Sequence, residues 1–188
     1  ALAMPAQEVN RLAGSHQATI RRFREDPDFE LLRAVGSGTF GKVWLARNRH
    51  NGRQYALKGM QKAALRAAPG GLWRRAIAEK HVLAKLAPHP FVVRWHGCFQ
   101  NDDAVFLVLT YVGGGTLESL QRAQPGARFA ERAARALSAE VVLALGHLHA
   151  HDVVFRDLKP TNVLVDARGH ACLTDFSTVS EYGDGGGG

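Results

Sequence analysis

Apolar and polar residues alternate in short runs from Phe29 to about Met60, after a different pattern at the start of the chain. Such alternation is typical of strands that have one buried and one solvated face. It predicts three antiparallel strands over residues 29–36, 41–48 and 53–60. Asn51-Gly52 lies between the last two, and this dipeptide is a strong signal for a β-hairpin.

A helical spacing follows near residues 72–86, where Glu79, Val82, Leu83 and Leu86 occur at i, i+3, i+4 and i+7. A carboxylate therefore lies on the apolar stripe of this helix. Two more strands are predicted over 92–99 and 104–110, and the glycines 113–115 indicate a flexible joint.

The second part of the chain has a mainly helical pattern. A short helix is predicted to start near Thr116, with Glu118 in its first turn. A long helix over 130–150 places one apolar stripe on a single face, formed by Leu137, Val141, Leu145 and Leu148. The pattern therefore predicts an α+β protein, with a mostly β part followed by a mostly α part.

Residues 1 to about 25 have the spacing of a basic helix. Val9, Leu12, Ile20 and Phe23 would lie on its apolar side, with arginines on the other. We interpret it as a helix that packs on the domain surface, and contact with a membrane is the less favoured alternative.

Composition narrows the class of protein. The chain has 188 residues and a net charge of +7, which suits nucleic acid, acidic lipid or a phosphate ligand. The arginines are spread over several predicted helices without a long basic run, so we do not expect nucleic acid to be a partner. No apolar run approaches the ~20 residues of a membrane span, and the first residues do not resemble a signal peptide.

Two cysteines, Cys98 and Cys172, lie in apolar stretches without metal-ligand spacing. We expect buried, reduced thiols of an intracellular protein.

The stretch "VGSGTFGKV" contains Gly36, Gly38 and Gly41. Glycines at this spacing let the backbone approach a phosphate and direct N–H groups toward it. Dinucleotide-binding folds use a similar spacing, but their glycines open a helix, whereas "KVWLA" continues here as a strand. An ordinary glycine-rich hairpin remains the alternative.

Lys58 lies in the otherwise apolar stretch "YALKGM". It is either on a solvated face or buried with a partner, and Glu79 is the candidate because it also lies on an apolar face. Pairing of Glu79 with Arg75 in its own helix is the alternative. One buried ion pair between Lys58 and Glu79 explains both positions, and such a pair would fix a cation beside a phosphate.

The stretch "VVFRDLKPTNVLVD" reads as strand, loop and strand, with Asp157, Lys159 and Asn162 in the loop. A carboxylate, an ammonium and an amide oxygen suit an acceptor hydroxyl, a phosphate and a metal ion respectively. A plain surface turn would explain Pro160 and Asn162, but not a carboxylate so close to apolar flanks.

In "CLTDFS", Asp175 follows a short predicted strand. A carboxylate there suits Mg²⁺, which takes one or two carboxylates together with phosphate oxygens. A turn or helix-cap aspartate is the alternative.

Taken in order, these four stretches resemble the catalytic domain of eukaryotic protein kinases over residues 29–182. The resemblance implies a five-stranded antiparallel small lobe with one main helix over 29–111. It also implies the start of a mainly helical large lobe over 112–188, and a helical extension over 1–28. The chain would stop at the start of the activation segment.

The resemblance also implies roles for individual residues. Lys58, held by Glu79, would bind the α- and β-phosphates, Lys159 would contact the γ-phosphate, and Asp157 would accept the proton of the substrate hydroxyl. Asn162 and Asp175 would hold Mg²⁺. Nucleotide would be bound by Val35, Gly36, Ser37, Gly38, Gly41, Val43, Ala56, Leu109 as the gatekeeper, and the backbone of Thr110, Tyr111 and Val112.

Lys159 in "RDLKPTN" resembles the serine/threonine class, and segments such as "LTYVGGGTL" resemble the AGC group. Three departures stand out. Phe155 replaces a tyrosine or histidine but keeps a ring to pack beneath Asp175. Ser177 replaces the glycine of Asp-Phe-Gly, where a Cβ disfavours left-handed backbone by roughly 1–2 kcal/mol. Thr116 and Thr161 stand where basic-directed relatives carry glutamates, so arginine-rich substrates are not expected.

The resemblance therefore implies an ATP- and Mg²⁺-dependent kinase for protein serine and threonine hydroxyls, monomeric and cytoplasmic, with the nucleus as second compartment. A non-catalytic nucleotide-binding pseudokinase or scaffold is the alternative.

Overall fold

The computed structural model describes residues 28–38, 41–67 and 72–181. The predicted N-terminal helix and the residues after Glu181 lie outside these ranges. The chain forms two compact units. The first contains the described residues up to Lys80 together with Trp95–Tyr111, and the second contains His81–Arg94 and the described residues from Val112 onward.

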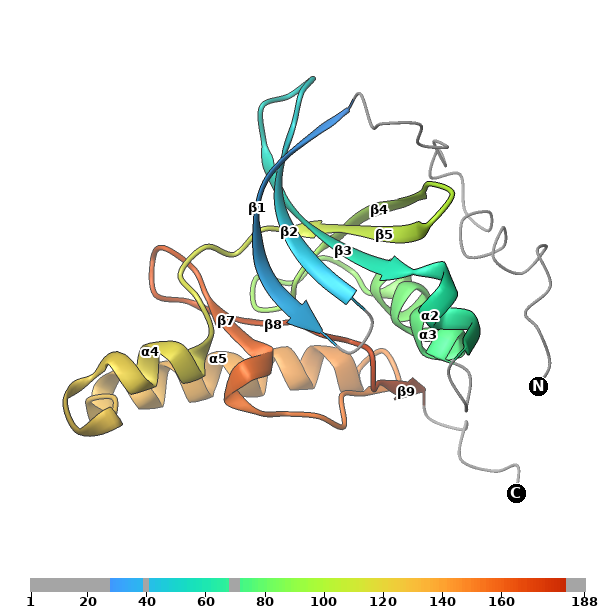
Figure 1. Cartoon of the computed structure of the whole chain (residues 1–188). Coiled ribbons are helices and arrows are strands. Elements are labelled where there is room, and N and C mark those ends of the chain that lie inside the picture. Colours follow the sequence, from blue (N-terminus) through green and yellow to red (C-terminus); the bar gives the residue numbers. More distant parts are fainter. Residues whose placement is uncertain (1–27, 39–40, 68–71, 182–188) are drawn as a thin grey trace. The chain divides into compact units, whose positions relative to one another are not determined.

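The first unit is built on an antiparallel sheet in the order β1-β2-β3-β5-β4 (Figure 1). The predicted α+β class and the five-stranded antiparallel sheet are therefore confirmed. The strands are β1 (Phe29–Gly38), β2 (Gly41–Asn48), β3 (Gln54–Gln61), β4 (Trp95–Gln100) and β5 (Ala104–Thr110).

The hairpin between β2 and β3 is present where the sequence predicts it. Asn48 organises the turn, because its Oδ1 accepts hydrogen bonds from the backbone of His50 and Asn51, both at 3.0 Å. Gly52 has a φ of 67°, which glycine adopts without strain. β3 begins at Gln54, one residue later than predicted.

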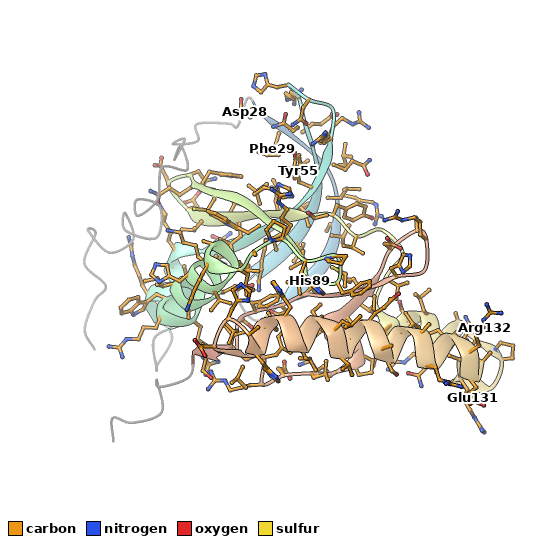
Figure 2. All side chains as sticks on the ribbon, turned by 180° about the vertical axis from the view of Figure 1, so that it is seen from behind. Asp28, Phe29, Tyr55, His89, Glu131 and Arg132 are labelled. Carbon is orange, nitrogen blue, oxygen red and sulfur yellow. The ribbon has the colours of Figure 1, made fainter. Side chains whose placement is uncertain are left out.

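β1 lies at an edge of the sheet and is irregular. Its pairing with β2 shifts register between Leu31 and Arg33 and again between Ala34 and Gly36. The ring of Phe29 meets Tyr55 edge-on at 5.8 Å, and both residues are labelled in Figure 2. The same ring stacks on Phe99 at 5.9 Å. These rings pack against buried Leu57 and Val108 in a small apolar core that anchors the first residues of β1.

Two helices accompany this sheet in the chain, α2 (Lys62–Ala67) and α3 (Leu72–Lys85). α3 is the helix predicted from the spacing of Glu79, Val82 and Leu83, all of which are buried. α2 has six residues and was not predicted, because so short a segment shows less than two turns of apolar periodicity.

The second unit contains two helices of very different length, α4 (Leu117–Ala123) and α5 (Glu131–His149). Both were predicted, and Thr116 caps α4 by accepting a hydrogen bond from the Ser119 backbone N–H at 3.1 Å. The remaining elements are short: η1 (Pro125–Ala127), β6 (Val153–Val154), η2 (Pro160–Asn162), β7 (Val163–Val165), β8 (Ala171–Leu173) and β9 (Ser180–Glu181).

Two predictions about this unit need correction. Residues 92–94 do not begin β4, because Val93 N–H donates to Leu173 O and Leu173 N–H donates to Phe91 O, which joins this segment to β8. The glycine segment 113–115 is not a loose joint. Gly114 N–H donates to Val165 O, and Val165 N–H donates to Gly115 O, each at 2.9 Å.

α5 buries part of its predicted apolar stripe. Leu137 and Leu148 are buried, while Val141 and Leu145 are half-buried. Val142 and Leu143 lie on the other side and are 65% and 58% exposed. None of the helices among the described residues has the length and apolar character needed to cross a membrane.

Candidate functional site

The predicted phosphate-binding glycines lie where β1 passes into β2. Gly36 is paired with Val43, Ser37 with Lys42, and Gly38 with Gly41. The described glycines of this stretch therefore lie in two paired antiparallel strands, as predicted, and do not open a helix. Thr39 and Phe40, between the paired ends, lie outside the described residues. Gly41 has no room for a side chain, because a Cβ would overlap the carbonyl oxygen of Gly59.

Lys58 and Glu79 form the buried ion pair that the sequence predicts. Lys58 Nζ lies 2.7 Å from Glu79 Oε1 and 2.9 Å from Oε2. The side chains are 10% and 1% exposed. Glu79 therefore pairs with β3, and the alternative pairing within its own helix is not needed to explain its position. The pair fixes an ammonium group on the face of the sheet toward α3.

Other predicted nucleotide-binding residues share this face of the sheet. Val43 lies opposite Lys58 across β2 and β3, and Ala56 lies opposite Leu109 across β3 and β5. Directly opposed residues of neighbouring strands point to the same side, so the sheet brings these residues together. Val35 is half-buried in β1, the edge strand of the same sheet, at a register shift.

β5 ends at Thr110, and the predicted hinge follows it. The hydroxyl of Thr110 is within 2.8 Å of His96 Nε2. The Tyr111 hydroxyl accepts a hydrogen bond from Arg33 Nη2 at 3.1 Å, which ties β1 to the end of β5. Val112 begins the second unit. The side chains of Thr110 and Tyr111 therefore have roles within the first unit, which agrees with a hinge that would contact a base through its backbone.

In the second unit, polar groups converge on Asp157. Lys159 Nζ lies 2.6 Å from Asp157 Oδ2. Asn162 Nδ2 donates to the same oxygen at 3.0 Å and to the Asp157 carbonyl at 2.9 Å. Among the described residues, the side-chain bonds to this carboxylate end on Oδ2, which leaves Oδ1 to accept a proton. The three loop residues predicted to act together thus lie together.

Asp175 follows β8 as predicted, and the backbone brings it near Asn162. Thr174 N–H donates to Asn162 O at 3.0 Å. Asn162 is buried, and its amide nitrogen donates to Asp157, so its amide oxygen is the atom that could bind a metal ion. A carboxylate and an amide oxygen are a donor set that fits Mg²⁺.

Metal binding by protein groups alone is not indicated. Within residues 28–38, 41–67 and 72–181, no three His, Cys, Asp or Glu side chains gather in a group that could hold an ion. Mg²⁺ at Asn162 and Asp175 would therefore complete its six ligands with phosphate oxygens and water.

The backbone beside these residues is constrained. Arg156 and Asp175 have φ values of 63° and 61°, in the left-handed region that non-glycine residues rarely adopt. Ser177 does not, so the penalty considered for its Cβ does not arise in this structure. Such unusual backbone tends to occur at functional sites, where the surrounding structure enforces it.

The segment that follows Asp175 is held by Arg156 and by the ring of Phe155. Arg156 Nε donates to Thr178 O at 2.6 Å, and its Nη2 donates to Val179 O at 2.9 Å. The ring of Phe155 meets Phe176 edge-on at 5.4 Å, and both are fully buried. The ring of Phe155 therefore packs against the residue that follows Asp175. The role of Arg156 could not be read from its neighbours, because its acceptors lie over 20 residues away.

The two thiols are buried, as predicted. Burial raises the pKa of Cys98, an effect that the charge of Lys80 partly opposes. Burial, with the charge of Asp166, raises the pKa of Cys172 to about 12. Neither thiol is an activated nucleophile, because the reactive form is the thiolate.

Comparison with known proteins identifies a family that covers the residues described above. Residues 29–186 match the family model described as the protein kinase domain. The chain is 41% identical over 178 residues to serine/threonine-protein kinase Sgk1 of Danio rerio, which covers 94% of this chain and 39% of that protein. For Sgk1 of Homo sapiens the identity is 39% over the same shares.

A second kind of relative is cAMP-dependent protein kinase type 3 of Saccharomyces cerevisiae. It is 43% identical over 149 residues, which covers 79% of this chain and 36% of that protein. The chain therefore spans less than two fifths of the length of these relatives.

Proposed function

This chain belongs to the protein kinase family, and from that premise we propose that it carries the nucleotide- and metal-binding part of a serine/threonine kinase. The predicted resemblance to the AGC group is confirmed by its relatives. The reaction would transfer the γ-phosphate of ATP to a protein hydroxyl, with Mg²⁺ as the metal.

The observation that carries this proposal is the convergence of Lys159 Nζ and Asn162 Nδ2 on Asp157 Oδ2. A carboxylate held on one oxygen can present the other to a substrate hydroxyl. As that hydroxyl oxygen bonds to the γ-phosphorus, the bond from phosphorus to the β–γ bridging oxygen breaks, and the hydroxyl proton passes to Asp157. Such a transfer depends mainly on positioning and on neutralising charge.

The other residues are proposed in supporting roles. Lys58, oriented by Glu79, would neutralise the α- and β-phosphates, and Lys159 would turn to the γ-phosphate. Gly36, Gly38 and Gly41 would let the backbone lie close to the phosphates. Bound Mg²⁺, held by Asn162 and Asp175, would neutralise charge that develops on the phosphate oxygens. The buried, reduced thiols support a cytoplasmic or nuclear setting.

Phosphate transfer from labelled ATP to a generic protein acceptor tests the proposal. The assay uses the chain and a longer protein in which it is followed by the remainder of a kinase domain. Lys58→Met and Asp157→Asn should each abolish transfer. Lys85→Met, on the exposed end of α3, and Asp102→Asn, in an exposed turn, should leave it unchanged.

Thermal stability with Mg-ATP separates this function from the pseudokinase alternative. An active kinase should be stabilised by Mg-ATP and should transfer phosphate. Stabilisation without transfer in the longer protein would favour a nucleotide-binding scaffold. Undiminished transfer in both Lys58→Met and Asp157→Asn would rule out the assigned roles.

A further inference from the structure

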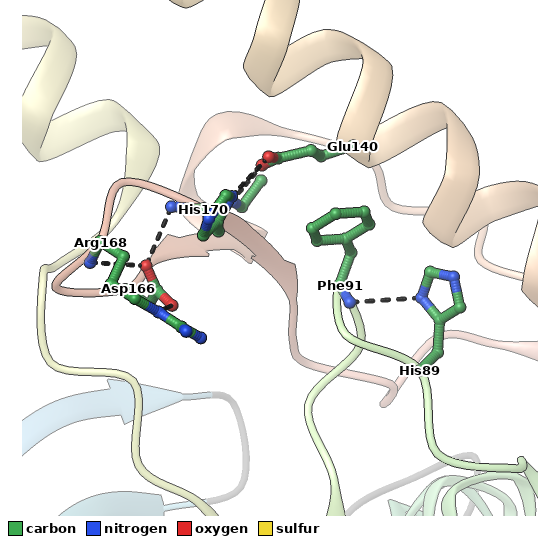
Figure 3. A network of polar contacts seen from close by, with 7 residues as sticks. His89, Phe91, Glu140, Asp166, Arg168 and His170 are labelled. Carbon is green, nitrogen blue, oxygen red and sulfur yellow. Dashed lines mark hydrogen bonds and ion pairs between the residues drawn. The ribbon is translucent and has the colours of Figure 1, made fainter.

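Glu140, in the middle of α5, uses both of its carboxylate oxygens on one end of β8. Its Oε1 accepts a hydrogen bond from His170 Nδ1 at 2.7 Å, and its Oε2 accepts one from the Ala171 backbone N–H at 2.7 Å (Figure 3). The Glu140 side chain is 15% exposed. It lies 30 residues from His170 in the sequence, and neither residue has a place in the proposed reaction.

Glu140 accepts a hydrogen bond from Ala171 N–H, a group that β7 does not pair. Val165 and Ala171 face each other in the β7–β8 hairpin, and Val165 N–H points away from β8 to Gly115 O. In an antiparallel ladder the opposed Ala171 N–H then also points away from its partner strand. Leu173, two residues on, gives its outward N–H to Phe91 O. Ala171 is 1% exposed, so Glu140 satisfies a buried N–H that water cannot reach.

The hairpin that Glu140 holds connects the two proposed metal ligands. Asn162 directly precedes β7, and Asp175 stands two residues after the end of β8. Thr174 N–H closes this end of the hairpin on Asn162 O.

The other end of the hairpin is closed by its turn. Asp166 Oδ1 accepts hydrogen bonds from the backbone N–H groups of Arg168 at 2.8 Å and His170 at 2.9 Å (Figure 3). The pKa of the Asp166 carboxyl is lowered, mainly by the hydrogen bond from His170 N–H. Asp166 is therefore charged near neutral pH and can hold the turn closed. With both ends closed, the hairpin is expected to move as one body.

α5 is also connected through the chain to Asp157, the proposed catalytic carboxylate. After α5 ends at His149, the chain passes through β6 to Asp157. We propose that Glu140 is a positioning residue: by holding β8 on α5, it fixes Asn162 and Asp175 relative to Asp157. The proposal rests on the function proposed above. Glu140 touches neither substrate nor metal, and acts only through His170 and Ala171.

Two substitutions separate the hydrogen bonds from the charge. Glu140→Ala removes both bonds. Glu140→Gln keeps the shape, since its oxygen can accept from Ala171 N–H and its amide nitrogen can donate to His170 Nδ1 in the other tautomer. Glu131→Ala is the matched control, because Glu131 lies on the same helix with a side chain that is 86% exposed.

The reactivity of Cys172 measures how readily the β7–β8 hairpin opens locally. Cys172 lies in β8 between Ala171 and Leu173, whereas Cys98 lies in the first unit. Alkylation by iodoacetamide is followed separately at each cysteine by mass spectrometry. Glu140→Ala should react about tenfold faster at Cys172, through local opening, and unchanged at Cys98. Glu140→Gln and Glu131→Ala should react like the wild type.

Metal affinity is the readout that a merely structural role would not change. Binding of Mn²⁺ with a non-hydrolysable ATP analogue is measured by water-proton relaxation. Glu140→Ala should bind Mn²⁺ about tenfold more weakly, as found when groups that orient metal ligands are removed. Glu140→Gln should recover most of the affinity, and Glu131→Ala should not differ from the wild type.

Each outcome decides the proposal. Unchanged Cys172 reactivity in Glu140→Ala, or unchanged Mn²⁺ affinity despite faster reaction, overturns it. If both cysteines of Glu140→Ala react faster, that variant has lost its fold, and His170→Ala is measured in its place. Mn²⁺ binding by His170→Ala that is at least about threefold weaker than in the wild type supports the proposal, and unchanged binding overturns it. If the wild-type chain binds Mn²⁺–nucleotide but the longer protein transfers no phosphate, only the proposed function is contradicted. Wild-type chain that binds none overturns both.

Discussion

The imidazole rings of His89 and His147 lie stacked, with their centroids 4.6 Å apart and 19° between their planes. His89 Nδ1 accepts a hydrogen bond from Phe91 N–H at 3.3 Å, which only an unprotonated nitrogen can do (Figure 3). His147 Nε2 lies 3.0 Å from Ala87 O, and the ring of His151 follows at 4.5 Å. Three imidazoles thus gather where the segment after α3 meets the end of α5, and protonation of His89 Nδ1 would break its bond with Phe91 N–H.

Stability should therefore fall in mild acid. Burial, followed by the charge of His147, lowers the pKa of His89 below its usual 6.5. Below pH 6.5 the unfolded chain binds this proton before the folded chain does, so the free energy of unfolding decreases until the folded pKa is reached. His89→Asn, whose Oδ1 can still accept from Phe91 N–H, should reduce the loss in melting temperature between pH 7.5 and pH 5.5.

The effect of the His147 charge on the pKa of His89 can be tested separately. His147→Gln removes the nearby charge, so the pKa of His89 should move up toward 6.5 in an NMR titration of its ring proton. His149→Gln changes an exposed histidine two residues along α5 and should leave the titration of His89 where it was. Identical titration curves for His89 in both variants and the wild type would contradict this account.

The buried pair of Lys58 and Glu79 should separate stability from activity. Lys58→Met or Glu79→Leu alone removes one member of a buried ion pair and should cost ~3–5 kcal/mol of unfolding free energy. The double variant removes both charges and should regain most of that loss in urea unfolding, yet transfer no phosphate. A double variant as unstable as either single variant would show that the pair is not the main interaction of these groups.

Gly114 and Gly146 should respond oppositely to alanine. A Cβ at Gly114 would overlap the carbonyl oxygen of Val165, so Gly114→Ala should destabilise the chain by ~1–3 kcal/mol. Gly146 lies inside α5, and an added Cβ would point into open space, so Gly146→Ala should stabilise the chain by ~0.5–1 kcal/mol. Urea unfolding measures both, and a neutral Gly114→Ala would mean that the glycine segment is not held on β7.

Ser177 should not behave as a strained residue. Its φ is not in the left-handed region, so Ser177→Gly relieves nothing and should lower stability by ~0.5–1 kcal/mol through the greater freedom of the unfolded chain. Ser177→Ala is the control for loss of the hydroxyl. If Ser177→Gly were more stable than both the wild type and Ser177→Ala, the backbone at this position would be strained.

Local patterns in the sequence predicted much of the first unit because its signals are local. Alternation gave the strands, Asn51-Gly52 marked a hairpin, and helical spacing placed Glu79 on an apolar face. Two charges on nominally buried faces were enough to predict the Lys58–Glu79 pair without structural information. For the loop residues Asp157, Lys159 and Asn162, the resemblance supplied roles that spacing alone left open.

Features that depend on distant partners could not be predicted. Nothing near Glu140 indicates an acceptor for Ala171 N–H, since the two are 31 residues apart. The glycines 113–115 suggest freedom, yet their small size lets the backbone pair with β7. Val92 and Val93 read as the start of a strand, and they do pair, but with Leu173. In each case tertiary hydrogen bonds override the local preference.

The register shifts in β1 also bear on how the protein behaves at high concentration. An edge strand of ten residues offers a row of N–H and C=O groups on which another chain could add a strand. The irregularities beside Arg33 and Gly36 interrupt that row, and charged Glu30 and Arg33 line it. Irregularities of this kind make an edge strand a poorer template for edge-to-edge aggregation.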